Sequence, residues 1–216
     1  MAKGAVTSRH VDTEPRVRRG YFECRYGQLH VHNAIPPGGG FEEGTSLLCV
    51  HSSVGSGRVF QRFLALAGRD RSVYAPDLPG FGESDPPPTR PAIADYAAAL
   101  GDFLDSMRFR HIDLLGYQMG ALVAAELAIA RPDQVRRLVL VSVPLLNETE
   151  RDTRQRLALI AQPALVLRPK DDLWDAQRAR ELLPKARFAD LAEQGNAVFE
   201  AAPEAVLASL KDFLRG

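Results

Sequence analysis

The sequence contains only two cysteines among its 216 residues and no surplus of charge of either sign. Cys24 and Cys49 each stand in a short β-prone run, which is typical of small buried thiols and fits a reducing compartment. The 27 basic residues equal the 27 acidic residues in number. This balance argues against recognition of nucleic acid, an anionic membrane surface or an acidic substrate through the overall field.

Long apolar runs are also missing. No stretch reaches the roughly 20 apolar residues of a membrane helix, and the first residues have no apolar signal core. We therefore predict a cytoplasmic protein that does not bind membranes. The sequence lacks a phosphate-binding P-loop, a dinucleotide fingerprint, a nucleic-acid module and a cluster of metal ligands, so neither a cofactor nor a metal is expected.

Length and charge distribution predict one domain with an arm in front of it. A chain of 216 residues is long enough for one continuous core and too short for two. Residues 1–19 have few large apolar side chains, and their basic residues outnumber Asp12 and Glu14. Those basic residues are Lys3, Arg9, Arg16, Arg18 and Arg19. We expect a flexible basic N-terminal arm at 1–19 and a single domain at 20–216.

The rest of the chain alternates between strand and helix patterns. Residues 21–26 and 28–33 are β-prone runs split by Gly27, which is typical of a hairpin. Apolar runs typical of strands buried on both faces follow at 46–51, 72–75, 111–115, 137–142 and 163–168. Helical spacing occurs at 58–67, 91–107, 119–130, 175–183 and 203–214. This alternation predicts an α/β fold with a doubly wound, mostly parallel sheet of about eight strands and a site at their carboxyl ends.

Three loops that follow predicted strands carry the most informative motifs. They read HSSVGSG at 51–57, DLPGFGESD at 77–85 and GYQMG at 116–120. A serine- and glycine-rich turn before a helix presents N–H groups that suit an anion or oxyanion. In this order, over about residues 21–214, the motifs resemble the α/β-hydrolase superfamily, in particular its epoxide hydrolase and haloalkane dehalogenase branch. The resemblance implies an α/β-hydrolase fold and makes 51–57 the oxyanion loop.

The resemblance also implies an elbow without its nucleophile. The family pattern G-x-S-x-G places a nucleophile on a sharp turn between strand and helix. The central position here is Gln118, whose amide nitrogen has its lone pair delocalised into the carbonyl and cannot be made a useful nucleophile. The elbow glycines Gly116 and Gly120 remain, so we expect the turn to persist.

Of the other two catalytic positions, the acid position keeps a carboxylate, whereas the histidine position has lost its histidine. The family's carboxylate position falls on Asp172, with Asp171 as the near alternative; both residues could instead be ordinary turn and cap residues. The histidine position falls on Asn196, which cannot accept a proton at neutral pH. Because losing a triad serine or histidine costs roughly a millionfold in turnover, we do not expect ordinary Ser-His-Asp hydrolysis.

The oxyanion loop supplies the remaining candidate site residues. Ser53 and Met119 would offer backbone N–H groups to an oxyanion, and His51 and Ser52 would lie beside them. Relocated catalysis is the alternative, with Ser52, Ser53 or Ser142 as nucleophile and His51 as base. None of these serines stands on an elbow, and the family mostly uses the histidine at the position of His51 structurally.

Residues 143–163 leave no room for the cap domain that the resemblance implies after the sixth strand. A lid normally excludes water from the pocket, so we expect an open pocket. Five apolar residues could then form an exposed patch that supports a homodimer, or Leu157 and Leu159 among them could simply pack under the shortened loop. The five are Val143, Leu145, Leu146, Leu157 and Leu159.

Three functional hypotheses follow from the loss of the catalytic serine and histidine. The favoured one is a pseudoenzyme that binds a small molecule or a protein partner, with Gln118, Asp172 and Asn196 as a polar floor for a carbonyl or amide ligand. The second is a non-hydrolytic or unusual enzyme, of lyase or cyclase type, that uses the oxyanion site. The third is a hydrolase with relocated residues, or one completed by an active homologue.

Overall fold

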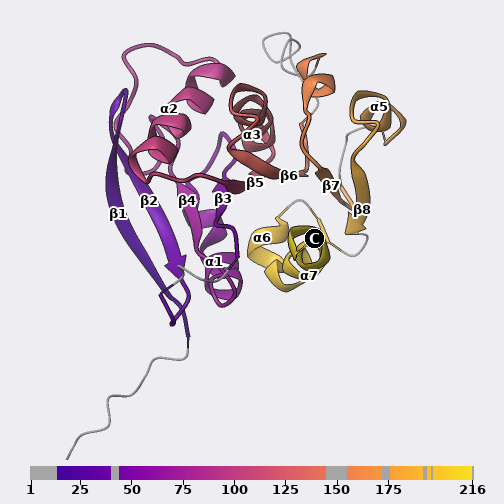
Figure 1. The fold of residues 1–216 in the computed structure, drawn as a ribbon, viewed down its shortest axis with the longest axis horizontal. Coiled ribbons are helices and arrows are strands. Elements are labelled where there is room, and N and C mark those ends of the chain that lie inside the picture. Colours follow the sequence, from indigo (N-terminus) through magenta and orange to yellow (C-terminus); the bar gives the residue numbers. More distant parts are fainter. Residues whose placement is uncertain are drawn as a thin grey trace, which may run out of the picture.

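The computed structural model describes residues 14–39, 44–144, 155–171, 176–191, 194–195 and 197–215. These residues form an eight-stranded sheet in the order β1-β2-β4-β3-β5-β6-β7-β8 (Figure 1). The strands are β1 (Arg16–Cys24), β2 (Gly27–Ile35), β3 (Leu47–Val50), β4 (Val73–Pro76), β5 (Ile112–Tyr117), β6 (Val135–Val141), β7 (Ala164–Pro169) and β8 (Arg187–Leu191). The helices are η1 (Gly57–Phe60), α1 (Gln61–Ala67), α2 (Ile93–Ser106), α3 (Met119–Ala130), η3 (Leu157–Leu159), α5 (Ala176–Leu182), α6 (Val198–Ala201) and α7 (Pro203–Arg215).

The sheet is parallel except at one edge. β1 pairs antiparallel with β2, and β2 pairs antiparallel with β4, whereas every pairing from β4 through β3 to β8 is parallel. β3, β4 and β5 are buried along their whole length, as expected for strands covered on both faces. The predicted doubly wound, mostly parallel sheet is confirmed.

Helices cover both faces of this sheet. In Figure 1, α1, α6 and α7 lie on one face and α2, α3 and α5 on the other. Each face has its own buried core, so side chains that alternate along β3 enter different cores: Leu48 packs with α2 and α3, and Cys49 packs with α1 and α7. Because all parallel strands end at the same edge, the loops after β3, β5 and β7 gather there.

The prediction of an arm at residues 1–19 is wrong for its last four residues. Residues 16–19 are not part of an arm, because they begin β1 and pair with β2. Val17 packs against the core of α1 and α7 while Arg16 and Arg18 are exposed, and such charge on an edge strand discourages pairing with other chains. Residues 1–13 lie outside the described residues.

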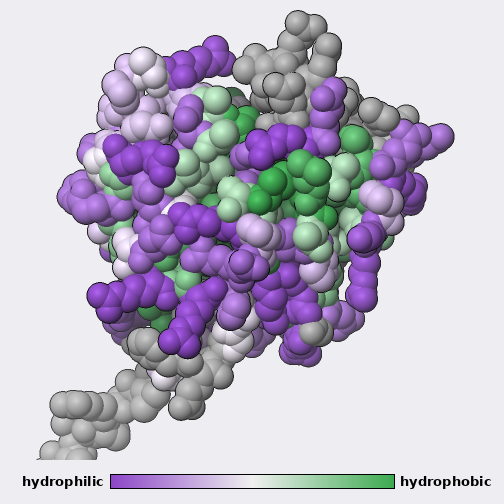
Figure 2. Space-filling view, turned by 45° about the horizontal axis from the view of Figure 1, so that its top comes forward, coloured by the Kyte–Doolittle hydropathy of each residue, from purple (hydrophilic) through white to green (hydrophobic). Residues whose placement is uncertain are grey.

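The connection from β6 to β7 covers residues 142–163, of which residues 145–154 lie outside the described residues. Leu157 is buried, as the alternative interpretation expected, but that interpretation is wrong for Leu159, which is 64% exposed. Val143 is also buried. Leu145 and Leu146 lie outside the described residues. Figure 2 shows that hydrophobic side chains gather in one continuous region on the face turned toward the viewer. Among the described helices, none is long and apolar enough to cross a membrane.

Candidate active site

The elbow predicted at Gln118 is present as a strained turn. Gln118 joins β5 to α3 with φ 51° and ψ −120°, a conformation that costs a residue with a side chain about 1–3 kcal/mol. Its N–H donates to the Val141 carbonyl at 2.9 Å, and its carbonyl accepts from the Ala121 N–H at 2.8 Å. Both bonds fix the backbone, so the predicted sharp turn is present with Gln118 at its centre.

The two elbow glycines are required by close approach of backbone to backbone. A Cβ atom at Gly116 would overlap the Gly120 carbonyl and the backbone of Ala121. A Cβ atom at Gly120 would overlap the carbonyl oxygens of Val50 and His51, at the end of β3. Since backbone atoms cannot swing aside, these contacts hold α3 against the oxyanion loop.

Beside the elbow lies a hollow of about 400 Å³. We call it the elbow hollow. It is lined by Ser52, Val54, Gly55, Ser56, Arg58, Val59, Tyr117, Gln118 and Glu200. Its lining combines hydroxyl groups, the Gln118 amide and one charge of each sign, so it suits a small polar ligand.

Arg58 and Glu200 line the elbow hollow but were not predicted from the sequence. Two residues that were predicted as oxyanion donors do not line it. Arg58 directly follows the oxyanion loop and Glu200 closely follows the Asn196 position, which was the available signal. Ser53 is exposed, Met119 is partly buried, and neither is among the residues that line the elbow hollow. Their role as oxyanion donors therefore stays a prediction.

His51 is a structural residue, and its predicted alternative role as a base is wrong for this conformation. The ring is fully buried. Its Nε2 accepts the Leu78 N–H at 2.8 Å, and Nδ1 lies 2.6 Å from the Ser52 carbonyl, to which it donates. Both nitrogens are thus engaged, and the neutral ring ties the oxyanion loop to the loop after β4.

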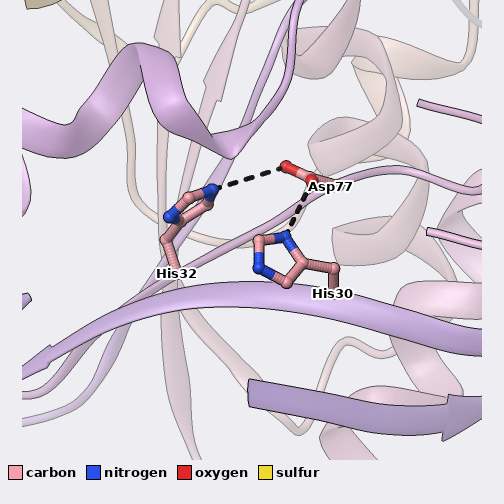
Figure 3. A group of neighbouring side chains, drawn as sticks. All are labelled: His30, His32 and Asp77. Carbon is pink, nitrogen blue, oxygen red and sulfur yellow. Dashed lines mark hydrogen bonds and ion pairs between the residues drawn. The ribbon is translucent and has the colours of Figure 1, made fainter. Parts of the chain in front are cut away.

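A buried network that the sequence analysis overlooked supports the same loop. Figure 3 shows the rings of His30 and His32, from β2, directed at the Asp77 carboxylate. His30 Nδ1 lies 2.8 Å from Asp77 Oδ2, and His32 Nε2 lies 3.9 Å from Asp77 Oδ1. The carboxylate also accepts N–H groups from Gly57 at 2.6 Å and Glu83 at 2.9 Å. Alternation along a strand, which puts His30 and His32 on one face, was the missed signal.

The same three side chains form a set of potential metal ligands, with ligand atoms within 4.8 Å of one another. Two imidazoles and a carboxylate are ligands that Zn²⁺ uses. Here both Asp77 oxygens already accept hydrogen bonds, and all three side chains are buried. The arrangement is that of a hydrogen-bonded support, which holds Gly57 at the start of η1.

Mild acid is expected to destabilise the fold through His51. Burial lowers the pKa of His51, whereas a histidine in the unfolded chain titrates at about 6.5. The contribution of neutral His51 is therefore complete above about pH 6.5 and is lost as the pH falls toward its lower folded-state pKa, because the unfolded state binds more protons. Urea unfolding at about pH 7.5 and about pH 5.5 measures this loss.

The matched control for that measurement is His51→Gln, which keeps one donor and one acceptor but does not titrate. We expect a smaller loss of stability in the variant than in the parent. Some loss remains in both, because burial also lowers the pKa of His32. An equal loss in the two proteins would contradict the assignment to His51.

The described residues next to the predicted acid and histidine positions lie side by side. The Lys170 N–H donates to the Gln194 carbonyl at 2.7 Å. A Cβ atom at Gly195 would lie 2.8 Å from a carboxylate oxygen of Asp171. Asp172 and Asn196 themselves lie outside the described residues. Ser142, a predicted substitute nucleophile, is 5% exposed.

Comparison with family models matches residues 47–215 to the alpha/beta hydrolase family. Lipase LipV of Mycobacterium tuberculosis is 33% identical over 164 residues, which are 76% of this chain and 57% of LipV. Uncharacterized protein Rv2715 of the same organism is 31% identical over 99 residues, which are 46% of this chain and 29% of that protein. The chain thus spans less than two thirds of either relative.

Solved structures agree on the fold. Cfl2 from Burkholderia cenocepacia superposes with a TM-score of 0.80 at 18% identity, covering 92% of this chain and 96% of Cfl2. At that identity the likeness concerns the fold alone.

Proposed function

The chain belongs to the alpha/beta hydrolase family, and from this premise we propose that it is a pseudoenzyme that binds a small carbonyl compound in the elbow hollow without hydrolysing it. The observation that carries the proposal is Gln118 on the strained elbow turn, at φ 51°. The turn still costs conformational energy, while the residue on it cannot attack a carbonyl.

The positions of the histidines support the proposal that the elbow hollow has no general base. Of the five in the sequence, His10 lies outside the described residues. His30, His32 and His51 are buried, and His30 and His51 are held by hydrogen bonds. His111 precedes β5 at the amino edge of the sheet, opposite the elbow. Within the described chain, no histidine lines the elbow hollow.

The lining of the elbow hollow suits a ligand with a carbonyl group and a polar substituent. The Gln118 amide can donate to a carbonyl oxygen and accept from an N–H or O–H group. Arg58 and Glu200 add a charge of each sign at its wall. Because LipV is named a lipase, we propose an ester or amide as the ligand class. Asp172 and Asn196 would complete the polar floor predicted from the sequence.

A hydrolase with a relocated nucleophile is the second candidate, because Ser52 lines the elbow hollow beside Gln118. A serine hydroxyl needs an adjacent base to become a nucleophile at neutral pH. The nearest ring in sequence, His51, uses both nitrogens elsewhere. This candidate therefore requires a rearrangement of the oxyanion loop, or residues from an interacting active homologue.

Two measurements on the purified protein test the proposal. A fluorophosphonate probe is expected to leave the protein unlabelled, and stoichiometric labelling of a serine would favour the second candidate instead. An NMR titration with a series of short aliphatic esters and amides is expected to give saturable binding, weakened about tenfold by Gln118→Ala. Gln177→Ala, an exposed position on α5, is the control and should leave the affinity unchanged.

A further inference from the structure

A second hollow, of about 630 Å³, lies at the opposite edge of the sheet. We call it the amino-edge hollow, because Leu47 begins β3 and Arg71 comes shortly before β4. Its walls include α1 and α7, which lie side by side on one face of the sheet (Figure 1). It is lined by Gly44, Thr45, Leu47, Ala67, Arg69, Asp70, Arg71, Arg136, Leu207, Leu210, Lys211, Leu214 and Arg215.

Positive charge is in excess around this hollow. One buried carboxylate, Asp113, is shared by Arg71 at 3.0 Å and Arg136 at 2.7 Å, so two guanidinium groups face one negative charge. Lys211 and Arg215 also line the hollow. No acidic side chain among the described residues forms an ion pair with either of them, so their positive charges are not neutralised.

The remaining charges do not cancel the excess. Arg69 is paired with Glu14 at 2.7 Å, and Asp70 is the one acidic residue in the lining. The amino-edge hollow thus keeps a net positive charge that its own acidic neighbours leave uncompensated. An anion is the complementary ligand.

The two central guanidinium groups are held in place before any ligand arrives. Arg136 donates to both oxygens of Asp113 and also to the Leu214 carbonyl at the end of α7. Arg71 donates to Asp113 and to the Thr45 carbonyl. Fixed side chains lose little conformational entropy when they bind a ligand, and planar guanidinium groups match phosphate oxygens well.

One apolar side chain in the lining, Leu207, is only partly buried, and it narrows the class of anion. The other four apolar lining residues, from β3, α1 and α7, are buried beneath it: Leu47, Ala67, Leu210 and Leu214. A volume of about 630 Å³ lies in the range of small-molecule sites. An inorganic ion would leave the apolar part unused.

We propose that the amino-edge hollow binds an organic phosphate monoester that carries an apolar group. The phosphate contacts the cations at the rim, where the exposed Lys211 and Arg215 join the fixed arginines, and the apolar group lies against Leu207 of α7. The site is separate from the elbow hollow and does not depend on the function proposed there.

An NMR titration at low salt with hexyl phosphate tests this site, with inorganic phosphate, hexanol and anionic phospholipid vesicles as separate arms. We expect saturable binding of hexyl phosphate with shifts at residues around α7, and binding at least about tenfold weaker for inorganic phosphate and hexanol. Equal affinity for inorganic phosphate, or binding to vesicles alone, would overturn the proposal.

The matched variants are Lys211→Ala/Arg215→Ala, which removes two exposed cations, and Arg90→Ala/Lys185→Ala, which removes two exposed cations elsewhere. The first pair should weaken hexyl phosphate binding about tenfold at an unchanged unfolding midpoint, and the second pair should not weaken it. If both pairs weaken the binding equally, the effect comes from the net charge of the protein, and the proposed site is wrong.

Discussion

Replacing Gly120 with valine is expected to destabilise the fold strongly. A side chain at this position would overlap the carbonyl oxygens of Val50 and His51, and neither can move without displacing the end of β3 from the sheet. We expect a loss of about 4 kcal/mol or more in the free energy of unfolding, against a total of about 5–15 kcal/mol for a typical domain. Urea unfolding followed by circular dichroism measures the loss.

The control for this variant is Ala130→Val, at the exposed end of the same helix. It introduces the same side chain with the same helix propensity, which costs less than about 1 kcal/mol. If the two variants unfold at similar urea concentrations, the close contact between the elbow and β3 does not limit stability. That result would contradict the view that the elbow glycines are kept for packing.

Replacing Asp113 with alanine is expected to cost about 3–5 kcal/mol, because it leaves buried cations without their partner. The carboxylate is fully buried, and the Arg71 side chain is only 13% exposed. Burial lowers the pKa of Arg71, and Asp113 opposes that effect. Without Asp113, the desolvation of the guanidinium groups of Arg71 and Arg136 is no longer offset.

Two further variants make this second prediction specific. Asp105→Ala removes an exposed carboxylate, 2.8 Å from Arg131, and should cost at most about 1 kcal/mol. Adding Arg71→Met to Asp113→Ala should recover part of the lost stability, because it removes one unpaired charge. An Asp113→Ala variant as stable as Asp105→Ala would contradict the account.

The parts of the fold that the sequence predicted well have a strong local signal. Buried strands such as β3 are continuous apolar runs, and α3 begins at Met119, as predicted, because two glycines flank the elbow. β8 was not predicted, because its residues are mostly half-buried or exposed and show no apolar run. The start of β1 was assigned to the arm because its alternating arginines resemble a charged tail.

The sequence predicted the motifs of the candidate site, but it did not predict which distant residues contact one another there. Gln118 was found because its position inside a five-residue motif is local. The contact of Asp77 with His30 joins residues far apart in the chain, and so does the placing of Arg58 and Glu200 around one hollow. Such contacts depend on the pairing of strands, which spacing along the sequence does not report.

The central claim is that the elbow turn persists while the chemistry it normally carries is absent. Its most direct test is the hydrolysis of a short p-nitrophenyl ester by the parent and by a Gln118→Ser/Asn196→His double variant. We predict that the parent stays at the background rate and that the double variant gains saturable turnover, roughly a hundredfold above the parent. Turnover by the parent itself at a rate typical of enzymes would contradict the claim and direct attention to Ser52.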